Sequence, residues 1–78
     1  MWFVYLLRCA DGSLYTGATN RLKHRIRAHT NGKAAKYTRS RRPVHLVRIE
    51  SCINKSEALS REWAIKQMTK AQKEELVK

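Results

Sequence analysis

The first twenty residues place the tightest constraint on the fold, because they predict two β-strands joined by a short turn. Residues 2–7 are rich in aromatic and aliphatic side chains, and residues 14–16 resume this character after a polar stretch. Asp11-Gly12 lies between them, and this dipeptide is typical of hairpin turns because glycine adopts a left-handed backbone without strain. The chain is therefore expected to begin with an antiparallel β-hairpin.

The length of the turn decides which side chains share a face of this hairpin. A three-residue loop at 10–12 pairs Tyr5 with Gly17 and places Tyr15 on the same face, whereas a two-residue loop puts the tyrosines on opposite faces. The longer loop is favoured because it gathers four apolar side chains on the other face: Val4, Leu6, Leu14 and Ala18. Gly17 opposite Tyr5 would leave room for a ligand. Two strand tyrosines alone are also compatible with simple packing.

The remainder of the chain predicts one further strand and several helices. In chain order we expect a helix over residues 20–30, capped by Thr19-Asn20 and ended by Asn31-Gly32, a basic loop over 33–42 and a strand over 44–51. A helix from about 55 to 68 capped by Asn54 and a short helix over 70–77 that starts at Thr69 should follow. In the strand, simple alternation puts Leu46 and Ile49 on opposite faces. A three-stranded sheet with helices packed on it suits this order, and the length predicts a single domain, residues 1–78.

The charge of the chain is large and unevenly distributed. The formal net charge is +11, and no Asp or Glu occurs between Gly12 and Ile49. The basic side chains of that stretch are Arg21, Lys23, Arg25, Arg27, Lys33, Lys36, Arg39, Arg41, Arg42 and Arg48. Such segregation favours a phosphate-bearing partner, with nucleic acid as the first expectation. Basic chains also bind anionic membranes or acidic proteins, so charge alone leaves those alternatives open.

The sequence disfavours several classes of protein and site. The apolar run at residues 2–7 is too short to span a membrane, and it lacks the basic leader and cleavage site of a secretory signal. We interpret Cys9 and Cys52 as reduced thiols on strands, and neither has metal-ligand spacing. We therefore expect a cytoplasmic protein with no membrane partner and no obligate protein partner.

A single carboxylate interrupts the apolar face of the helix that is expected from residue 55. Ala58, Leu59 and Ile65 define an arc, and at about 100° per residue Glu62 falls near its middle. An unpaired buried carboxylate is costly, so Glu62 should either pair with a basic side chain such as Arg25 or bind a divalent cation such as Mg²⁺. Arg25 lies beside the apolar stripe of its own helix and is the arginine best placed to face inward.

Taken in order, these residues resemble the GIY-YIG nuclease superfamily in its small stand-alone bacterial form. The first motif corresponds to Phe3-Val4-Tyr5 and the second to Tyr15-Thr16-Gly17, while the family arginine and glutamate correspond to Arg25 and Glu62. His29 also resembles a position seen in several branches. The resemblance covers essentially the whole chain. It implies an α+β fold of order β-β-α-β-α-α, in which a three-stranded antiparallel sheet is flanked by helices.

The resemblance further implies a divalent-metal-dependent endonuclease that hydrolyses DNA phosphodiester bonds with low sequence specificity. Glu62 would hold Mg²⁺ or Mn²⁺, and Arg25 would neutralise the charge that develops on the phosphate. Tyr5, and less readily Tyr15, would accept a proton from the attacking water. His29 would bond a phosphate or assist proton transfer.

Substrate contacts are implied by the same resemblance. Gly17 would let the backbone approach the ligand closely. Five residues of the basic loop would hold the nucleic-acid backbone: Lys36, Tyr37, Arg39, Arg41 and Arg42. Tyr37 would also stack on an unpaired base.

Three departures from the family pattern bear on activity. Phe3 stands where the first motif has a glycine, Ala18 stands where many members carry a lysine, and no asparagine follows Glu62. These departures keep a second interpretation open, in which the same fold is a non-catalytic module that binds DNA or RNA. A third interpretation is an adaptor that docks its basic face on an acidic protein.

Overall fold

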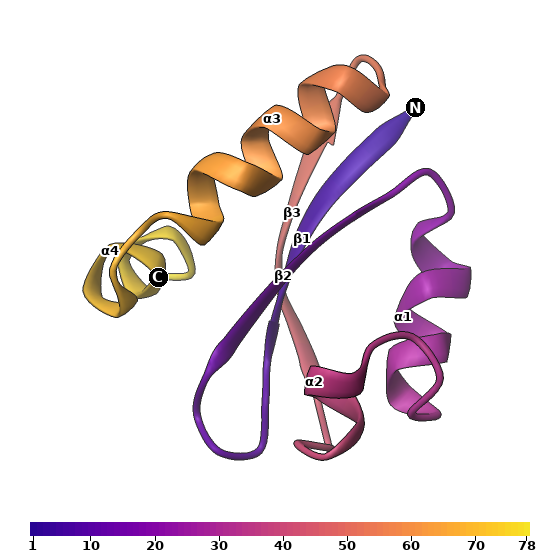
Figure 1. The fold of residues 1–78 in the computed structure, drawn as a ribbon, viewed down its shortest axis with the longest axis vertical. Helices are drawn as coiled ribbons and strands as arrows, with labels where there is room; N and C mark the ends of the chain where they lie inside the picture. The colour runs from indigo at the N-terminus through magenta and orange to yellow at the C-terminus, as the bar shows by residue number, and fades with distance from the viewer.

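The computed structural model describes residues 1–78 and consists of a three-stranded antiparallel sheet with helices on both of its faces (Figure 1). The strands are β1 (Trp2–Arg8), β2 (Leu14–Thr19) and β3 (His45–Cys52), in the spatial order β2-β1-β3. The helices are α1 (Leu22–Thr30), α2 (Lys36–Arg39), α3 (Lys55–Lys66) and α4 (Lys70–Leu76). In Figure 1, α3 and α4 lie on one side of the sheet, and α1 and α2 lie on the other. The expected fold class is confirmed, and α2 is an additional short helix within the expected basic loop.

The N-terminal hairpin has the expected three-residue loop. Gly12 adopts a left-handed φ of 84°. In the resulting register Tyr5 lies opposite Gly17, and Leu7 lies opposite Tyr15. Because side chains alternate along a strand, both tyrosines project from the same face of the sheet, as predicted.

The apolar core lies between the sheet and the pair α3 and α4. Val4 and Leu6 of β1 are fully buried and cluster with Ala58 and Ile65 of α3. Partly buried side chains extend this cluster: Trp2, Leu14, Ala18, Met68, Leu76 and Val77. Full burial of an aliphatic side chain contributes about 1.5–3 kcal/mol, so this face is a main source of stability. The apolar face predicted for the hairpin is confirmed.

A β-bulge interrupts the pairing of β3 with β1. The register shifts by one residue between Leu6 and Leu7, which leaves Val47 as the extra residue. Leu46 and Ile49 consequently lie on the same face of the sheet. The expectation that they lie on opposite faces was wrong, because one inserted residue reverses the alternation of the strand.

The helix boundaries agree with the sequence at most ends. The cap predicted for α1 at Thr19-Asn20 is wrong: Thr19 Oγ1 accepts from the Arg21 N–H at 3.0 Å, and Arg21 precedes the helix without a side-chain cap. The end of α1 is confirmed by the left-handed φ of 74° at Gly32. The side chains of Asn54 and Thr69 cap α3 and α4 as expected. None of the helices has the length and apolar character that a membrane span requires.

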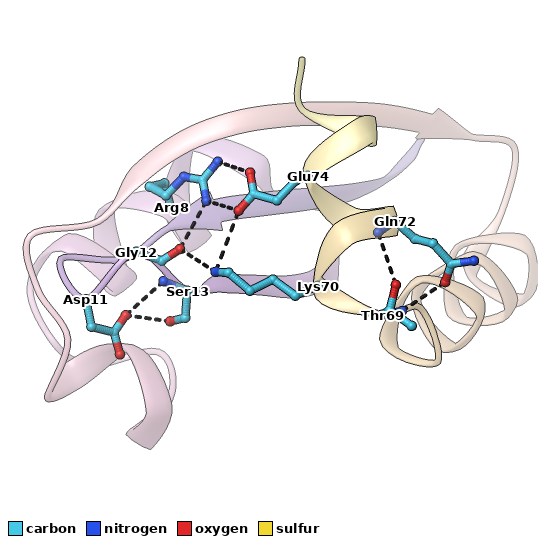
Figure 2. Close-up of polar contacts among 8 residues, drawn as sticks. All are labelled: Arg8, Asp11, Gly12, Ser13, Thr69, Lys70, Gln72 and Glu74. Atoms are coloured by element: carbon cyan, nitrogen blue, oxygen red, sulfur yellow. Dashed lines mark hydrogen bonds and ion pairs between the residues drawn. The ribbon is translucent and has the colours of Figure 1, made fainter.

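Helix α4 is tied to the hairpin tip, as Figure 2 shows. The Arg8 guanidinium pairs with both carboxylate oxygens of Glu74 and donates to the Gly12 carbonyl at 3.0 Å. Nζ of Lys70 donates to the same carbonyl at 3.1 Å. The hydrogen bond from Arg8 holds the pKa of the Glu74 carboxyl below its usual range. This cluster fixes the turn from which β2 begins.

Candidate active site

Tyr5 and His29 form the centre of the polar face of the sheet. Both are nearly buried, with Tyr5 2% exposed and His29 1% exposed. The Tyr5 hydroxyl lies 2.7 Å from Nε2 of His29, at hydrogen-bonding distance. His29 follows Leu22 and Ile26 along one stripe of α1, so the same packing that seats the helix brings the imidazole to the phenol.

A second hydrogen bond ties His29 to α2. Its Nδ1 lies 2.8 Å from Oγ1 of Thr38, which is fully buried. The Thr38 hydroxyl in turn lies 3.2 Å from the carbonyl oxygen of Ala35. Both ring nitrogens of His29 are therefore engaged, one by β1 and the other by the loop that contains α2.

Gly17 is required by the position of Tyr5. A Cβ atom at residue 17 would overlap Oη and Cζ of the tyrosine. The space opposite Tyr5, which we expected to admit a ligand, is therefore filled by the phenol itself, and that expectation was wrong. The glycine instead lets the phenol lie against the backbone of β2 while it reaches His29.

Tyr15 and Tyr37 extend the site as a group of aromatic rings. Tyr15 meets His29 edge to face at 5.2 Å between ring centroids, and Tyr37 stacks on Tyr15 at 5.9 Å. The Arg41 guanidinium lies 3.8 Å from the centroid of the Tyr37 ring. Tyr37 was expected to stack on an unpaired base, but its ring is engaged within the protein, where it supports Tyr15.

Burial sets the protonation of the two central groups. It raises the pKa of the Tyr5 hydroxyl, Tyr15 and Glu62 act in the same direction, and Arg25 opposes them. Burial, reinforced by the charge of Arg25, lowers the pKa of His29. At neutral pH the site therefore holds a protonated phenol beside a neutral imidazole. The charges of Arg25 and Glu62 both act on the Tyr5 hydroxyl.

The Glu62 carboxylate pairs with Lys66, and not with Arg25, which was one basic partner expected from the sequence. It lies 3.3 Å from Nζ of Lys66, one turn further along α3, and its side chain is 20% exposed. Arg25 forms no ion pair. Its side chain is exposed, so its guanidinium is available to an anionic ligand.

Glu62 is the one residue near Tyr5 that could hold a divalent cation. No group of three or more His, Cys, Asp or Glu side chains is arranged as a metal site. Mg²⁺ needs no such group, because it is commonly held by one or two carboxylates together with water and substrate phosphate oxygens. A partly exposed carboxylate with a single lysine contact fits that mode of binding.

The basic side chains of the loop differ in whether they bond within the protein. Lys36 and Arg39 are exposed and, with Lys33, line an open depression of about 550 Å³. Arg41 and Arg42 instead bond within the protein, to an aspartate of the hairpin tip at 3.0 Å and to a loop carbonyl at 3.1 Å. Arg41 and Arg42 thus fasten the loop, and the expectation that they also hold the nucleic-acid backbone stays a prediction.

Two residues of the site carried no distinguishing signal in the sequence. Thr38 is a hydroxyl residue in a basic loop, nine positions after His29, and no periodicity links the two. Lys33 belongs to the acid-free stretch, but charge alone does not separate it from its neighbours. Both are identified only by the path of the loop between α1 and β3.

Comparison with known proteins assigns the chain to a family. The family model described as the GIY-YIG catalytic domain matches residues 1–75. A UPF0213 protein of Desulfotalea psychrophila is 55% identical over 78 residues, which cover 99% of this chain and 71% of the relative. A UPF0213 protein of Clostridium perfringens is 57% identical over 77 residues, which cover 99% of this chain and 83% of the relative.

A solved structure shares the fold. It is the solution NMR structure of a UPF0213 protein from Bacillus halodurans, which is 45% identical and superposes with a TM-score of 0.64. The match covers 99% of this chain and 83% of that one. The three-stranded sheet with its helices is thus the architecture of a solved relative as well.

Proposed function

Because this chain belongs to the GIY-YIG domain family, we propose that it is a divalent-metal-dependent endonuclease that hydrolyses DNA phosphodiester bonds with low sequence specificity. The observation that carries the proposal is the 2.7 Å hydrogen bond between the Tyr5 hydroxyl and His29. It couples a phenol to a proton acceptor beside Arg25 and Glu62. Two free, buried cysteines support a cytoplasmic location for the enzyme.

Tyr5 and His29 would take the proton of the attacking water. As the water oxygen bonds to phosphorus, the bond from phosphorus to the leaving sugar oxygen breaks, and that oxygen takes a proton from solvent. The proton of the attacking water moves to Oη of Tyr5, and the phenolic proton moves to Nε2 of His29. This coupled transfer avoids a free phenolate, which burial disfavours by raising the pKa of Tyr5. The lowered pKa of His29 keeps its imidazole neutral and able to receive the proton.

Glu62 and Arg25 would manage the charge of the phosphate. Glu62 would hold Mg²⁺ or Mn²⁺, and a cation bound there supplies Lewis-acid stabilisation of the phosphoryl and leaving oxygens. The exposed, unpaired guanidinium of Arg25 would donate to a non-bridging phosphate oxygen, where charge grows in the transition state.

The substrate backbone would follow the basic depression beside α2. Lys33, Lys36 and Arg39 line it, and the net charge of +11 favours a polyanion over the whole surface. Contacts of this kind position phosphates without reading bases, which is why we propose low sequence specificity.

The test is cleavage of supercoiled, branched and single-stranded DNA by the purified protein in Mg²⁺, in Mn²⁺ and in excess EDTA. The wild type should cleave only with metal, and Glu62→Gln, which keeps the shape but removes the charge, should be slower by about 100-fold or more. Glu75→Gln is the matched control, because Glu75 is an exposed glutamate of α4 and should be dispensable. Equal cleavage by the wild type and Glu62→Gln would reveal a contaminating nuclease and contradict the proposal.

A second function, a non-catalytic module that binds DNA or RNA, is favoured by the raised pKa of Tyr5 and by the alanine at position 18. In that case Glu62→Gln would bind nucleic acid like the wild type, and binding would need no metal. Replacement of Lys36 and Arg39 by alanine would still weaken binding. Tight binding without metal-dependent cleavage would favour this function over the first.

A further inference from the structure

Thr38 lies at the end of a chain of hydrogen bonds that begins at Tyr5. The Tyr5 hydroxyl lies 2.7 Å from Nε2 of His29, and Nδ1 of His29 lies 2.8 Å from Oγ1 of Thr38. The Thr38 hydroxyl lies 3.2 Å from the Ala35 carbonyl. The chain holds one phenolic hydrogen, one imidazole hydrogen and one threonine hydrogen, so counting their acceptors decides which atom donates in each link.

With the imidazole hydrogen on Nδ1, every hydrogen of the chain has an acceptor. Tyr5 donates to Nε2, Nδ1–H donates to Oγ1 of Thr38, and the Thr38 hydroxyl donates to the Ala35 carbonyl. That carbonyl also accepts the Arg39 N–H at 3.0 Å, which its two lone pairs allow. All three links are then satisfied at once.

With the hydrogen on Nε2, the count fails. Nε2–H would donate to the Tyr5 oxygen, and Thr38 would donate to Nδ1, which leaves the phenolic hydrogen without an acceptor in the protein. Tyr5 is 2% exposed, and a buried hydroxyl hydrogen without a partner is unfavourable. We therefore propose that Thr38 is a positioning residue, whose hydroxyl holds His29 as the Nδ1–H tautomer so that the bare Nε2 faces Tyr5.

With this assignment, the loop that contains α2 both supplies positive charge and orients the imidazole of His29. The side chains of Lys36 and Arg39 face the basic depression, while Thr38 between them is fully buried against the imidazole. The same short helix thus joins the substrate surface to the proton acceptor. The catalytic consequence rests on the proposed nuclease function, whereas the tautomer is a property of the protein without substrate.

The tautomer can be read directly from ¹⁵N NMR spectra of the imidazole groups at pH 7.5. His24→Gln and His45→Gln, at two exposed positions, assign the signals of His29 by elimination. The wild type and Thr38→Ser should show a protonated Nδ1 and a bare Nε2, whereas Thr38→Val should shift His29 toward the Nε2–H form. A wild-type His29 protonated on Nε2 would overturn the proposal, and that spectrum decides the matter even if Thr38→Val fails to fold. An unchanged tautomer in folded Thr38→Val would overturn it too.

Cleavage kinetics of the same variants test the consequence. Thr38→Val should lower kcat by about 100-fold with KM unchanged, because general acid–base assistance is of this order, and Thr38→Ser should restore most of the rate. Cleavage by folded Thr38→Val at the wild-type rate would overturn the positioning role while leaving the nuclease proposal intact. If the wild type itself shows no metal-dependent cleavage, the nuclease proposal fails, and the ¹⁵N spectra still decide the tautomer.

Discussion

The two faces of the sheet are built from the same strand, yet they differ in what holds them together. The side chains of Val4 and Leu6 in β1 pack into the apolar core under α3 and α4, whereas the side chain of Tyr5 projects toward α1 and α2. The first face is closed by packing, whereas the second is organised by hydrogen bonds from Tyr5 through His29 to Thr38. Because side chains alternate along a strand, β1 supplies core residues to one face of the sheet and a candidate catalytic residue to the other.

Leu6→Ala should produce the largest effect on stability and the smallest on chemistry. Leu6 is fully buried in the core, so its truncation should lower the free energy of unfolding by about 2–5 kcal/mol. Urea unfolding followed by circular dichroism gives that value, and cleavage per folded molecule should stay near the wild-type rate. If the variant is folded but inactive, the two faces are not separable; Leu6→Val offers a milder step should the variant not fold.

Arg25→Ala should show the reverse pattern. Loss of a donor to the transition state should cost about 3 kcal/mol, which is a rate loss of roughly 100-fold or more. The free energy of unfolding should change by less than about 0.5 kcal/mol, since Arg25 is exposed and unpaired. Arg27→Ala, at an exposed position on the same helix, is the control. Equal rate losses in both variants would indicate a general charge effect and count against a specific role.

The two faces should lose stability in different pH ranges. Burial lowers the pKa of His29, so below the ordinary histidine pKa of about 6.5 the unfolded state binds a proton that the folded state does not. The free energy of unfolding therefore decreases as the pH is lowered through this range. On the core face, hydrogen bonds from Arg61 and Arg48 lower the pKa of Glu50, whose contribution is present above about 4.3 and lost as pH falls further. Unfolding measured from pH 8 downward should show His29→Gln flattening the upper range and Glu50→Gln the lower. The opposite assignment would contradict this account.

The smallest effects should appear in the salt dependence of DNA binding. Lys36→Ala and Arg39→Ala should each reduce the slope of log K against log salt by about 0.9 if each removes one phosphate contact on duplex DNA. Arg42→Ala should leave the slope unchanged, because the Arg42 guanidinium bonds to the carbonyls of Arg39 and Thr30. Fluorescence anisotropy over a salt series with a labelled duplex measures these slopes. A larger change for Arg42 than for Lys36 would reverse our division of the loop.

The features that could be predicted from the sequence are those set by near neighbours. The register that puts Tyr5 opposite Gly17 follows from a three-residue turn, and the caps at Asn54 and Thr69 lie within four residues of the groups they bond. Their residue types and spacing contain the physical cause. Helix α3 was likewise predicted from its own periodicity and cap.

The features that could not be predicted depend on distant segments. The bulge at Val47 is a mismatch between β3 and β1, and no pattern within β3 alone marks it. The bond of His29 to Thr38 depends on the path of the loop. The ion pair between Glu62 and Lys66 is local, but the sequence contains other basic side chains that could have paired with Glu62. Arg25 is excluded as its partner only by the placement of the helices.

The most direct measurement of the central claim is the single-turnover rate of Mg²⁺-dependent DNA cleavage by Tyr5→Phe beside the wild type. The substitution keeps the ring and removes only the hydroxyl that bonds to His29. We expect the rate to fall by about 100-fold or more, while the free energy of unfolding falls by only about 1 kcal/mol. A folded Tyr5→Phe variant that cleaves within about twofold of the wild-type rate, a difference under about 0.5 kcal/mol in the barrier, would contradict the account.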